Sequence, residues 1–95
     1  MATGTIRKEV TYERTSETLS NAVSVSANSY ATVSIDITKS GYIPLSVSQL
    51  QTNSGASVIV AGWNMTDTTL AAVVRNFTSS AVQTRVAYKI LYAKL

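Results

Sequence analysis

The sequence contains no cysteine and no histidine. It therefore forms no disulfide, no Cys or His metal site, and no Ser-His or Cys-His nucleophile pair. Acidic residues are also few, and Glu9, Glu13 and Glu17 are interleaved with basic residues. This arrangement favours a solvated or ion-paired face over the paired carboxylates of a glycoside hydrolase. We expect no enzymatic activity, no metal and no cofactor.

Charge is sparse, at 14% of residues against roughly 25% in an average domain. The net charge of +3 comes from Arg75, Arg85, Lys89 and Lys94, which are spread along the end of the chain. Nucleic-acid binding needs basic residues concentrated in one stripe that contacts phosphates. We therefore expect no nucleic-acid partner, and we interpret these residues as solubilising charges on strands.

Long apolar runs are missing. The longest nearly apolar run, residues 58–65, is far shorter than the roughly 20 residues of a membrane-spanning helix. Residues 1–15 contain no apolar stretch typical of a secretory signal. We expect no membrane insertion and synthesis in a cytoplasm without export by the usual route.

What remains is a chain rich in serine, threonine and β-branched residues, which suit half-exposed strands. Its 95 residues and 10.1 kDa predict a single domain over residues 1–95, with residues 1–4 as a flexible lead. Alternating patterns predict strands at residues 5–14, 19–26, 30–38, 42–50, 57–65, 68–76 and 82–95. Turn signals separate them about every ten residues. We predict an all-β fold of seven to eight strands, an antiparallel β-sandwich of jelly-roll-like type, with a compact barrel as the alternative.

Three strands carry more specific predictions. Residues 82–95 form the longest alternating pattern, and both faces become apolar toward the end, which predicts a central strand or one that meets a neighbouring subunit. Residues 57–65 are apolar on both faces, which predicts an interior strand. Pro44 has no backbone N–H, so residues 42–50 should form an edge strand or contain a bulge at that point.

Aromatic residues are the best candidates for a ligand-binding surface, because an aromatic ring stacks on the apolar face of a sugar. We single out Trp63, Tyr42 and Tyr30, with Asn64 and Asp67 as hydrogen-bonding neighbours. The alternative for Trp63 is a place in the core beside Gly62. Asn64 and Asp67 match no calcium-loop spacing, so a turn explains them better than a metal site.

The last strand also predicts self-association. Tyr88, Ile90, Leu91 and Tyr92 offer more apolar surface than one strand face buries, and a domain this small is only marginally stable alone. A closed symmetric oligomer would cover that surface. We predict an oligomer interface at these four residues.

Three segments carry a resemblance to a known group of proteins. They are SGYIPL at residues 40–45, RNFTSS at residues 75–80 and YKILY at residues 88–92. With the alternating Ser/Thr strands, they resemble the small β-sandwich modules of bacteriophage and prophage tail fibres and baseplates. The resemblance implies a non-enzymatic virion structural protein, made in a host bacterial cytoplasm. It further implies a homotrimer that binds host-surface saccharide or other virion proteins.

Two other functions fit the same residues. One is a monomeric carbohydrate-binding module, which requires Trp63 and at least one tyrosine exposed side by side. The other is a capsid-decorating structural protein without a ligand. Solution mass and binding to host cells distinguish the three.

Overall fold

The computed structural model describes residues 10–95, and strands make up most of this part of the chain. In chain order the elements are β1 (Tyr12–Arg14), β2 (Thr18–Leu19), β3 (Val23–Val25), β4 (Tyr30–Asp36), β5 (Tyr42–Thr52), η1 (Gly55–Ser57), β6 (Val58–Met65), β7 (Thr69–Asn76), β8 (Val82–Thr84) and β9 (Val86–Lys94). The prediction of an all-β antiparallel sandwich is confirmed. Residues 1–9, which include the expected flexible lead and most of the strand expected at 5–14, lie outside the described residues.

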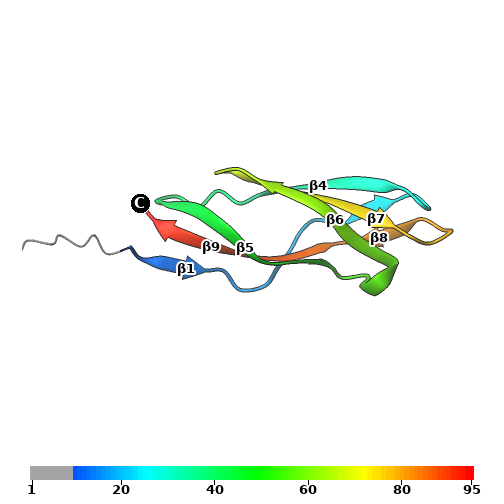
Figure 1. Cartoon of the computed structure of the whole chain (residues 1–95), viewed down its shortest axis with the longest axis horizontal. Helices are drawn as coiled ribbons and strands as arrows, with labels where there is room; N and C mark the ends of the chain where they lie inside the picture. The colour runs from blue at the N-terminus through cyan, green and yellow to red at the C-terminus, as the bar shows by residue number, and fades with distance from the viewer. Residues whose placement is uncertain (1–9) are drawn as a thin grey trace, which may run out of the picture.

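The strands form three antiparallel sheets (Figure 1). The β4–β7–β6 sheet has β7 in its middle. The β9 sheet has β5 along one edge of β9 and both β1 and β2 along the other. A short β3–β8 pair completes the fold. There are nine strands in the described residues, where seven or eight were expected, because two of the expected strands are each divided in two.

Strand β9 is central to its sheet, as its two apolar faces predicted. The expected single strand at 82–95 is nevertheless interrupted at Arg85. Its first part, β8, pairs with β3, whereas β9 pairs with β5 and with β1 and β2. Asn53 holds the break, because its side-chain oxygen accepts the Arg85 N–H at 2.9 Å and its own N–H donates to the Arg85 carbonyl at 2.9 Å.

The prediction that residues 57–65 form an interior strand is wrong. Strand β6 pairs only with β7 and is an edge of its sheet. Its outer side chains, such as Ile59, are exposed, so an apolar residue pattern on both faces did not mean burial on both faces. A register shift between Val60 and Gly62 marks a bulge in this strand.

Pro44 predicted that this strand is an edge strand or contains a bulge, and both are found in β5. It pairs with β9 alone, and its register shifts between Pro44 and Ser46 and again between Val47 and Gln49. Bulges and a proline at an edge strand hinder pairing with another chain. Pro44 itself is buried.

The core lies where the β4–β7–β6 sheet faces the β9 sheet and the β3–β8 pair. Its fully buried side chains come from all of them, with Leu70 and Val74 from β7, Ile90 from β9 and Val25 from β3. The opposite faces are rich in hydroxyl and small side chains. They are the surfaces on which a binding site must be sought.

A candidate binding surface around Arg75

A row of large side chains crosses the outer face of the β4–β7–β6 sheet near one end. Tyr30, the first residue of β4, lies opposite Arg75 in β7, and Arg75 lies opposite Ile59 in β6. Residues directly opposite in an antiparallel pair project to the same face. These three side chains therefore stand side by side on the surface away from the core.

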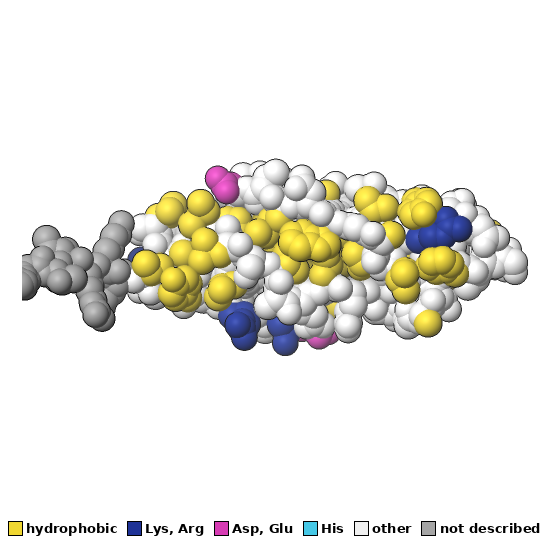
Figure 2. All heavy atoms as spheres, viewed as in Figure 1, with side chains coloured by type: hydrophobic (Ala, Val, Ile, Leu, Met, Phe, Trp, Pro, Cys, Tyr) yellow, Lys and Arg dark blue, Asp and Glu magenta, His cyan; other side chains and the backbone are white. Residues whose placement is uncertain are grey.

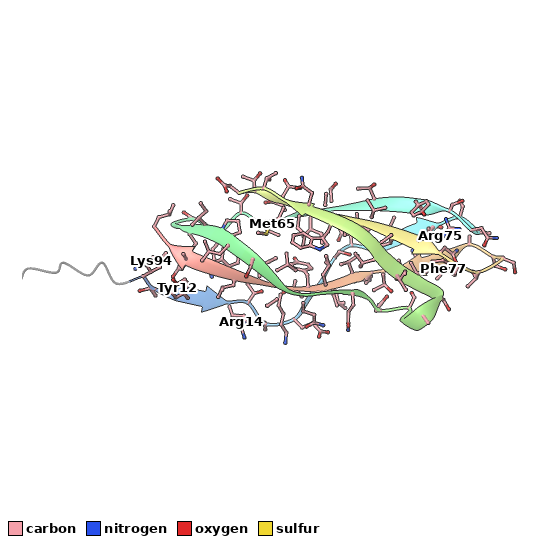
Figure 3. The ribbon with its side chains drawn as sticks, in the orientation of Figure 1. Tyr12, Arg14, Met65, Arg75, Phe77 and Lys94 are labelled. Carbon is pink, nitrogen blue, oxygen red and sulfur yellow. The ribbon has the colours of Figure 1, made fainter. Side chains whose placement is uncertain are left out.

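Arg75 lies between two aromatic rings. Its guanidinium carbon is 4.7 Å from the centre of the Tyr30 ring and 5.1 Å from the centre of the Phe77 ring. Both rings remain open to solvent, with exposed fractions of 60% for Tyr30 and 53% for Phe77. We call Tyr30, Arg75 and Phe77 the Arg75 stack. Figure 3 labels Arg75 and Phe77 at this end of the molecule, where Figure 2 shows a basic side chain between hydrophobic ones.

The backbone around the stack is fixed by Asn76. This residue is fully buried and points to the core, so its neighbours Arg75 and Phe77 project outward. Its side-chain amide donates to the carbonyls of Val25 at 3.0 Å and Ser80 at 2.8 Å. Its side-chain oxygen accepts from the Thr78 N–H at 2.8 Å and hydroxyl at 2.7 Å.

Two further backbone hydrogen bonds hold the ends of this segment. The Asn76 N–H donates to the carbonyl of Ser29 at 2.9 Å, and the Phe77 N–H donates to the carbonyl of Ser57 at 2.9 Å. The first ties the segment to the start of β4 and the second ties it to the start of β6. The backbone that carries Arg75 and Phe77 is thus held between the starts of β4 and β6, which reduces the backbone ordering that binding requires.

The guanidinium of Arg75 has no hydrogen-bond or ion-pair partner within residues 10–95. Each acidic side chain of this range either makes a polar contact elsewhere or lies far from Arg75. Glu13 pairs with Lys39 at 2.6 Å, and Glu17 accepts a hydrogen bond from Gln49 at 3.0 Å. Asp36 lies at the opposite end of β4 from Tyr30, about 20 Å away at the usual rise of a strand, and Asp67 lies in the turn before β7, at the opposite end of that strand from Arg75. Stacking uses the faces of the guanidinium and leaves its N–H groups, which lie in its plane, available.

A hollow lies between β5 and β6 and includes Ile59 in its wall. It has a volume of about 350 Å³ and is lined by Leu50, Gln51, Thr52, Gly55, Val58, Ile59 and Val60. Ile59 lies opposite Arg75, so this residue connects the hollow to the stack. A ligand on the stack therefore has room to extend over the side of β6.

The predicted ligand-binding residues do not form one site. Tyr30 belongs to the Arg75 stack. Trp63 is 53% exposed, but it lies opposite the buried Ala72, on the core-facing side of the edge strand β6. It is neither enclosed in the core nor beside Tyr30. An added methyl group at Gly62 would contact nothing within 4 Å, so this glycine does not make room for a ring.

Tyr42 lies in a different cluster, at the end of the molecule where β9 ends. Its ring meets that of Tyr92 edge to face, with centres 6.4 Å apart, and the Lys39 ammonium lies 4.8 Å from the centre of the Tyr42 ring. Tyr42 is half-buried, and its packing against Tyr92 and Lys39 explains its position without a ligand.

Asn64 and Asp67 are exposed near the β6–β7 hairpin turn. Thr66 organises this turn, because its hydroxyl oxygen accepts the N–H groups of Thr69 at 3.1 Å and Thr68 at 3.4 Å. The turn interpretation thus has a structural basis. Within residues 10–95 no group of three Asp, Glu, His or Cys side chains is placed to hold a metal ion.

The four residues expected at an oligomer interface point in two directions. Ile90 and Tyr92 are enclosed by the chain's own core, and Tyr92 donates a buried hydrogen bond to the Ile37 carbonyl at 2.6 Å. This corrects the expectation for these two residues, because they offer no surface to a partner. Tyr88 is half-buried on the same side. Leu91 is half-buried on the outer face, between Arg14 and Ser46.

Sequence reasoning missed Arg75 and Phe77 as binding residues. The i, i+2 spacing places both on one face of a strand, which the sequence does show. Their proximity to Tyr30 depends on the register between β4 and β7, in which Tyr30 lies opposite Arg75. No local pattern fixes that register.

In comparisons with known proteins, the chain matches no family, no curated protein and no solved structure. The only helix in the described residues is the single turn η1, which is too short to cross a membrane.

Proposed function

We propose that the protein is a non-enzymatic structural and adhesion module of the phage tail-fibre or baseplate type, which binds saccharide through the Arg75 stack. The resemblance of residues 40–45, 75–80 and 88–92 supports the virion role. The observation that supports binding is a pair of aromatic residues, Tyr30 and Phe77, that remain more than half exposed on a backbone fixed by hydrogen bonds. Large aromatic residues anchored in this way are typical of recognition surfaces.

Saccharide is the ligand class that fits the surroundings best. The exposed rings suit the apolar face of a sugar, and the exposed hydroxyl of Thr32, two residues from Tyr30 on the same face of β4, supplies a hydrogen-bonding group. The hollow beside Ile59 offers space for a second sugar unit. The surface is open and shallow, as expected for the recognition of a chain on a cell surface.

A glycan array and a host-cell binding assay test this proposal. We expect the wild-type protein to bind, and the double variant Tyr30→Ala, Phe77→Ala to lose about tenfold or more in affinity, because each stacked ring contributes on the order of 1 kcal/mol. Leu45→Ala is the control, since Leu45 is also a large exposed apolar residue but lies on β5, away from the stack. Blank arrays and unlabelled cells would remove the adhesion role and leave only a structural one.

We also propose that the module is a homotrimer. Leu91 supports this part, since it projects from the outer face of the β9 sheet. The next row on that face contains the exposed Tyr12, the small Ala93 and the half-buried Ile43. An apolar strip on a small domain is stabilised by burial against a second copy.

The alternative of a monomeric carbohydrate-binding module receives support from one observation, the exposure of Trp63. That function requires a tyrosine beside the tryptophan. Tyr30 lies on the opposite face of its sheet, and Tyr42 packs against Tyr92. We therefore place the saccharide site at the Arg75 stack.

A further inference from the structure

We infer that the ligand of the Arg75 stack carries a carboxylate, so that the site selects acidic sugars over neutral ones. The inference rests on the proposed saccharide-binding function and specifies the chemistry of its ligand. We base it on two observations, the aromatic rings beside the Arg75 guanidinium and the absence of an anionic partner for it within residues 10–95. The guanidinium carbon lies 4.7 Å and 5.1 Å from the centres of two aromatic rings, and within residues 10–95 no anion pairs with its N–H groups.

A guanidinium in this position is prepared for an oxyanion. Its N–H groups form a planar fork that matches the two oxygens of a carboxylate. The two nearby rings displace part of the water around the guanidinium, which strengthens a charge-assisted hydrogen bond to its N–H groups. A lysine ammonium would retain the charge but would present neither the fork nor a flat surface for stacking.

The same arrangement explains why the ligand should be a sugar that bears the carboxylate. The sides of Tyr30 and Phe77 that face away from Arg75 remain open, because more than half of each residue is exposed. A pyranose ring whose carboxylate binds the Arg75 edge has apolar C–H groups next to these aromatic surfaces. Ile59 adds an apolar contact on the β6 side. A simple inorganic anion would use the charge and leave the apolar surface uncovered.

The charge distribution of the chain agrees with this assignment. Arg75 is not neutralised by its neighbours in the sheet, since its cross-strand partners are Tyr30 and Ile59. The acidic residue of β4, Asp36, lies at the end of that strand farther from Arg75. A negative ligand therefore meets no local repulsion at this end of the molecule.

The experiment compares matched pairs of probes on the wild-type protein. Galacturonate, glucuronate and sialate oligosaccharides are titrated calorimetrically beside their methyl esters, which retain the sugar and remove only the charge. We expect at least one acidic probe to bind about 10- to 100-fold more tightly than its ester, because a charged acceptor strengthens hydrogen bonds to this extent. Polyglutamate, which carries carboxylates without sugar rings, should bind at least tenfold more weakly than that probe.

Substitutions test whether Arg75 causes the difference in affinity between acidic probes and their esters. Arg75→Gln should abolish the difference between acid and ester, and Arg75→Lys should restore only a small part of it. Arg85→Gln is the control. It removes the same charge from an exposed residue at the interruption between β8 and β9, and it should leave the difference between acid and ester unchanged. Circular dichroism and thermal melts establish that each variant is folded.

The outcomes separate the two proposals. Equal binding of acids and esters, both lost in the Tyr30→Ala, Phe77→Ala variant, would overturn the carboxylate assignment and retain the saccharide site. Equal binding of polyglutamate would show a plain anion site and overturn the sugar part. Binding of no acidic probe, while neutral glycans bind in the array, would overturn this inference alone. Absence of binding to any glycan would overturn the proposed function with it.

Discussion

Asn76 is the side chain on which the geometry of the Arg75 stack depends. It is buried between two outward-pointing residues, and its amide makes four hydrogen bonds, to Val25, Ser80 and Thr78. A buried asparagine in a strand is costly unless every polar atom is paired, and here each is. The position of Phe77 relative to Arg75 follows from this one residue.

We therefore expect Asn76→Ala to destabilise the fold by about 2 to 4 kcal/mol, because it removes four hydrogen bonds and leaves the Val25 carbonyl without its donor. Urea denaturation measures this. Asn64→Ala is the control, since Asn64 is exposed and its change should stay within about 0.5 kcal/mol. Equal effects of the two variants would contradict the role given to Asn76.

Gly41 is the second residue with a specific conformational role. It has a φ of +81° in the turn between β4 and β5, where the Tyr42 N–H donates to the Lys39 carbonyl at 3.0 Å. A left-handed glycine at this place is typical of a type II turn. Gly62 lies in a strand without a positive φ and has free space where a Cβ would stand.

The two glycines should therefore respond oppositely to alanine. Gly41→Ala should cost about 1 kcal/mol, because a side chain is strained at positive φ. Gly62→Ala should be neutral or stabilise by up to about 1 kcal/mol, because it lowers the entropy of the unfolded chain. Thermal melts of both variants measure the difference, and a destabilised Gly62→Ala would contradict the open space seen beside it.

At the scale of elements, the short strand β1 is held to the rest of the sandwich by an ion pair. The Lys39 ammonium, in the turn after β4, lies 2.6 Å from the Glu13 carboxylate in β1. This hydrogen bond to Lys39 lowers the pKa of Glu13 below its usual value of 4.5. The Lys39 and Glu13 side chains are 30% and 47% exposed, so solvent screens the pair, and it orders β1 more than it stabilises the whole fold.

The lowered pKa sets the direction of a pH dependence. A carboxylate with a lowered pKa in the folded state contributes stability above pH 4.5, and this contribution is lost as the pH falls through the folded-state pKa. We expect the protection of β1 amides against exchange, taken relative to the intrinsic rate at each pH, to decrease below pH 4.5, and Glu13→Gln to show reduced protection already at pH 7. Glu17→Gln, which removes a carboxylate bonded to Gln49, is the control. Unchanged exchange in Glu13→Gln would refute the tether.

The strands were predictable where alternation and burial coincide. Residues 30–38 alternate strictly, and β4 buries Val33 and Ile35 as that pattern requires. The Asn53-Ser54-Gly55 turn was also predictable, since Gly55 has a φ of +61°. In these segments local chemistry and tertiary packing favour the same conformation.

Other features depend on contacts that no local pattern contains. The interruption at Arg85 follows from Asn53, more than thirty residues earlier in the chain. The position of β6 at an edge depends on strand order, which an apolar sequence does not specify. The Arg75 stack likewise needs the β4–β7 register, so only Tyr30 among its members was predicted.

At the scale of the whole molecule, the open question is which surfaces meet other molecules. The stack stands on the outer face of the β4–β7–β6 sheet, while Leu91 projects from the outer face of the β9 sheet. These faces belong to different sheets of the sandwich (Figure 1). Assembly through Leu91 would therefore leave the stack free to bind.

Light scattering over a wide concentration range tests the trimer. We expect a stable mass near three times 10.1 kDa. Leu91→Asp should reduce it to the monomer mass without unfolding the chain, because each large apolar side chain returned to water loses about 1.5 to 3 kcal/mol of burial. Leu45→Asp, at an exposed leucine on β5, is the matched control. A wild-type monomer at every concentration would contradict the trimer.

Chemical-shift mapping of the labelled protein shows whether saccharide binds at the Arg75 stack. The titrant is the oligosaccharide that binds most tightly in the array. We expect the largest shifts at Tyr30, Arg75 and Phe77, with smaller ones at Ile59. Shifts centred on Trp63, with the stack unchanged, would contradict this expectation and favour a binding site on the side of β6.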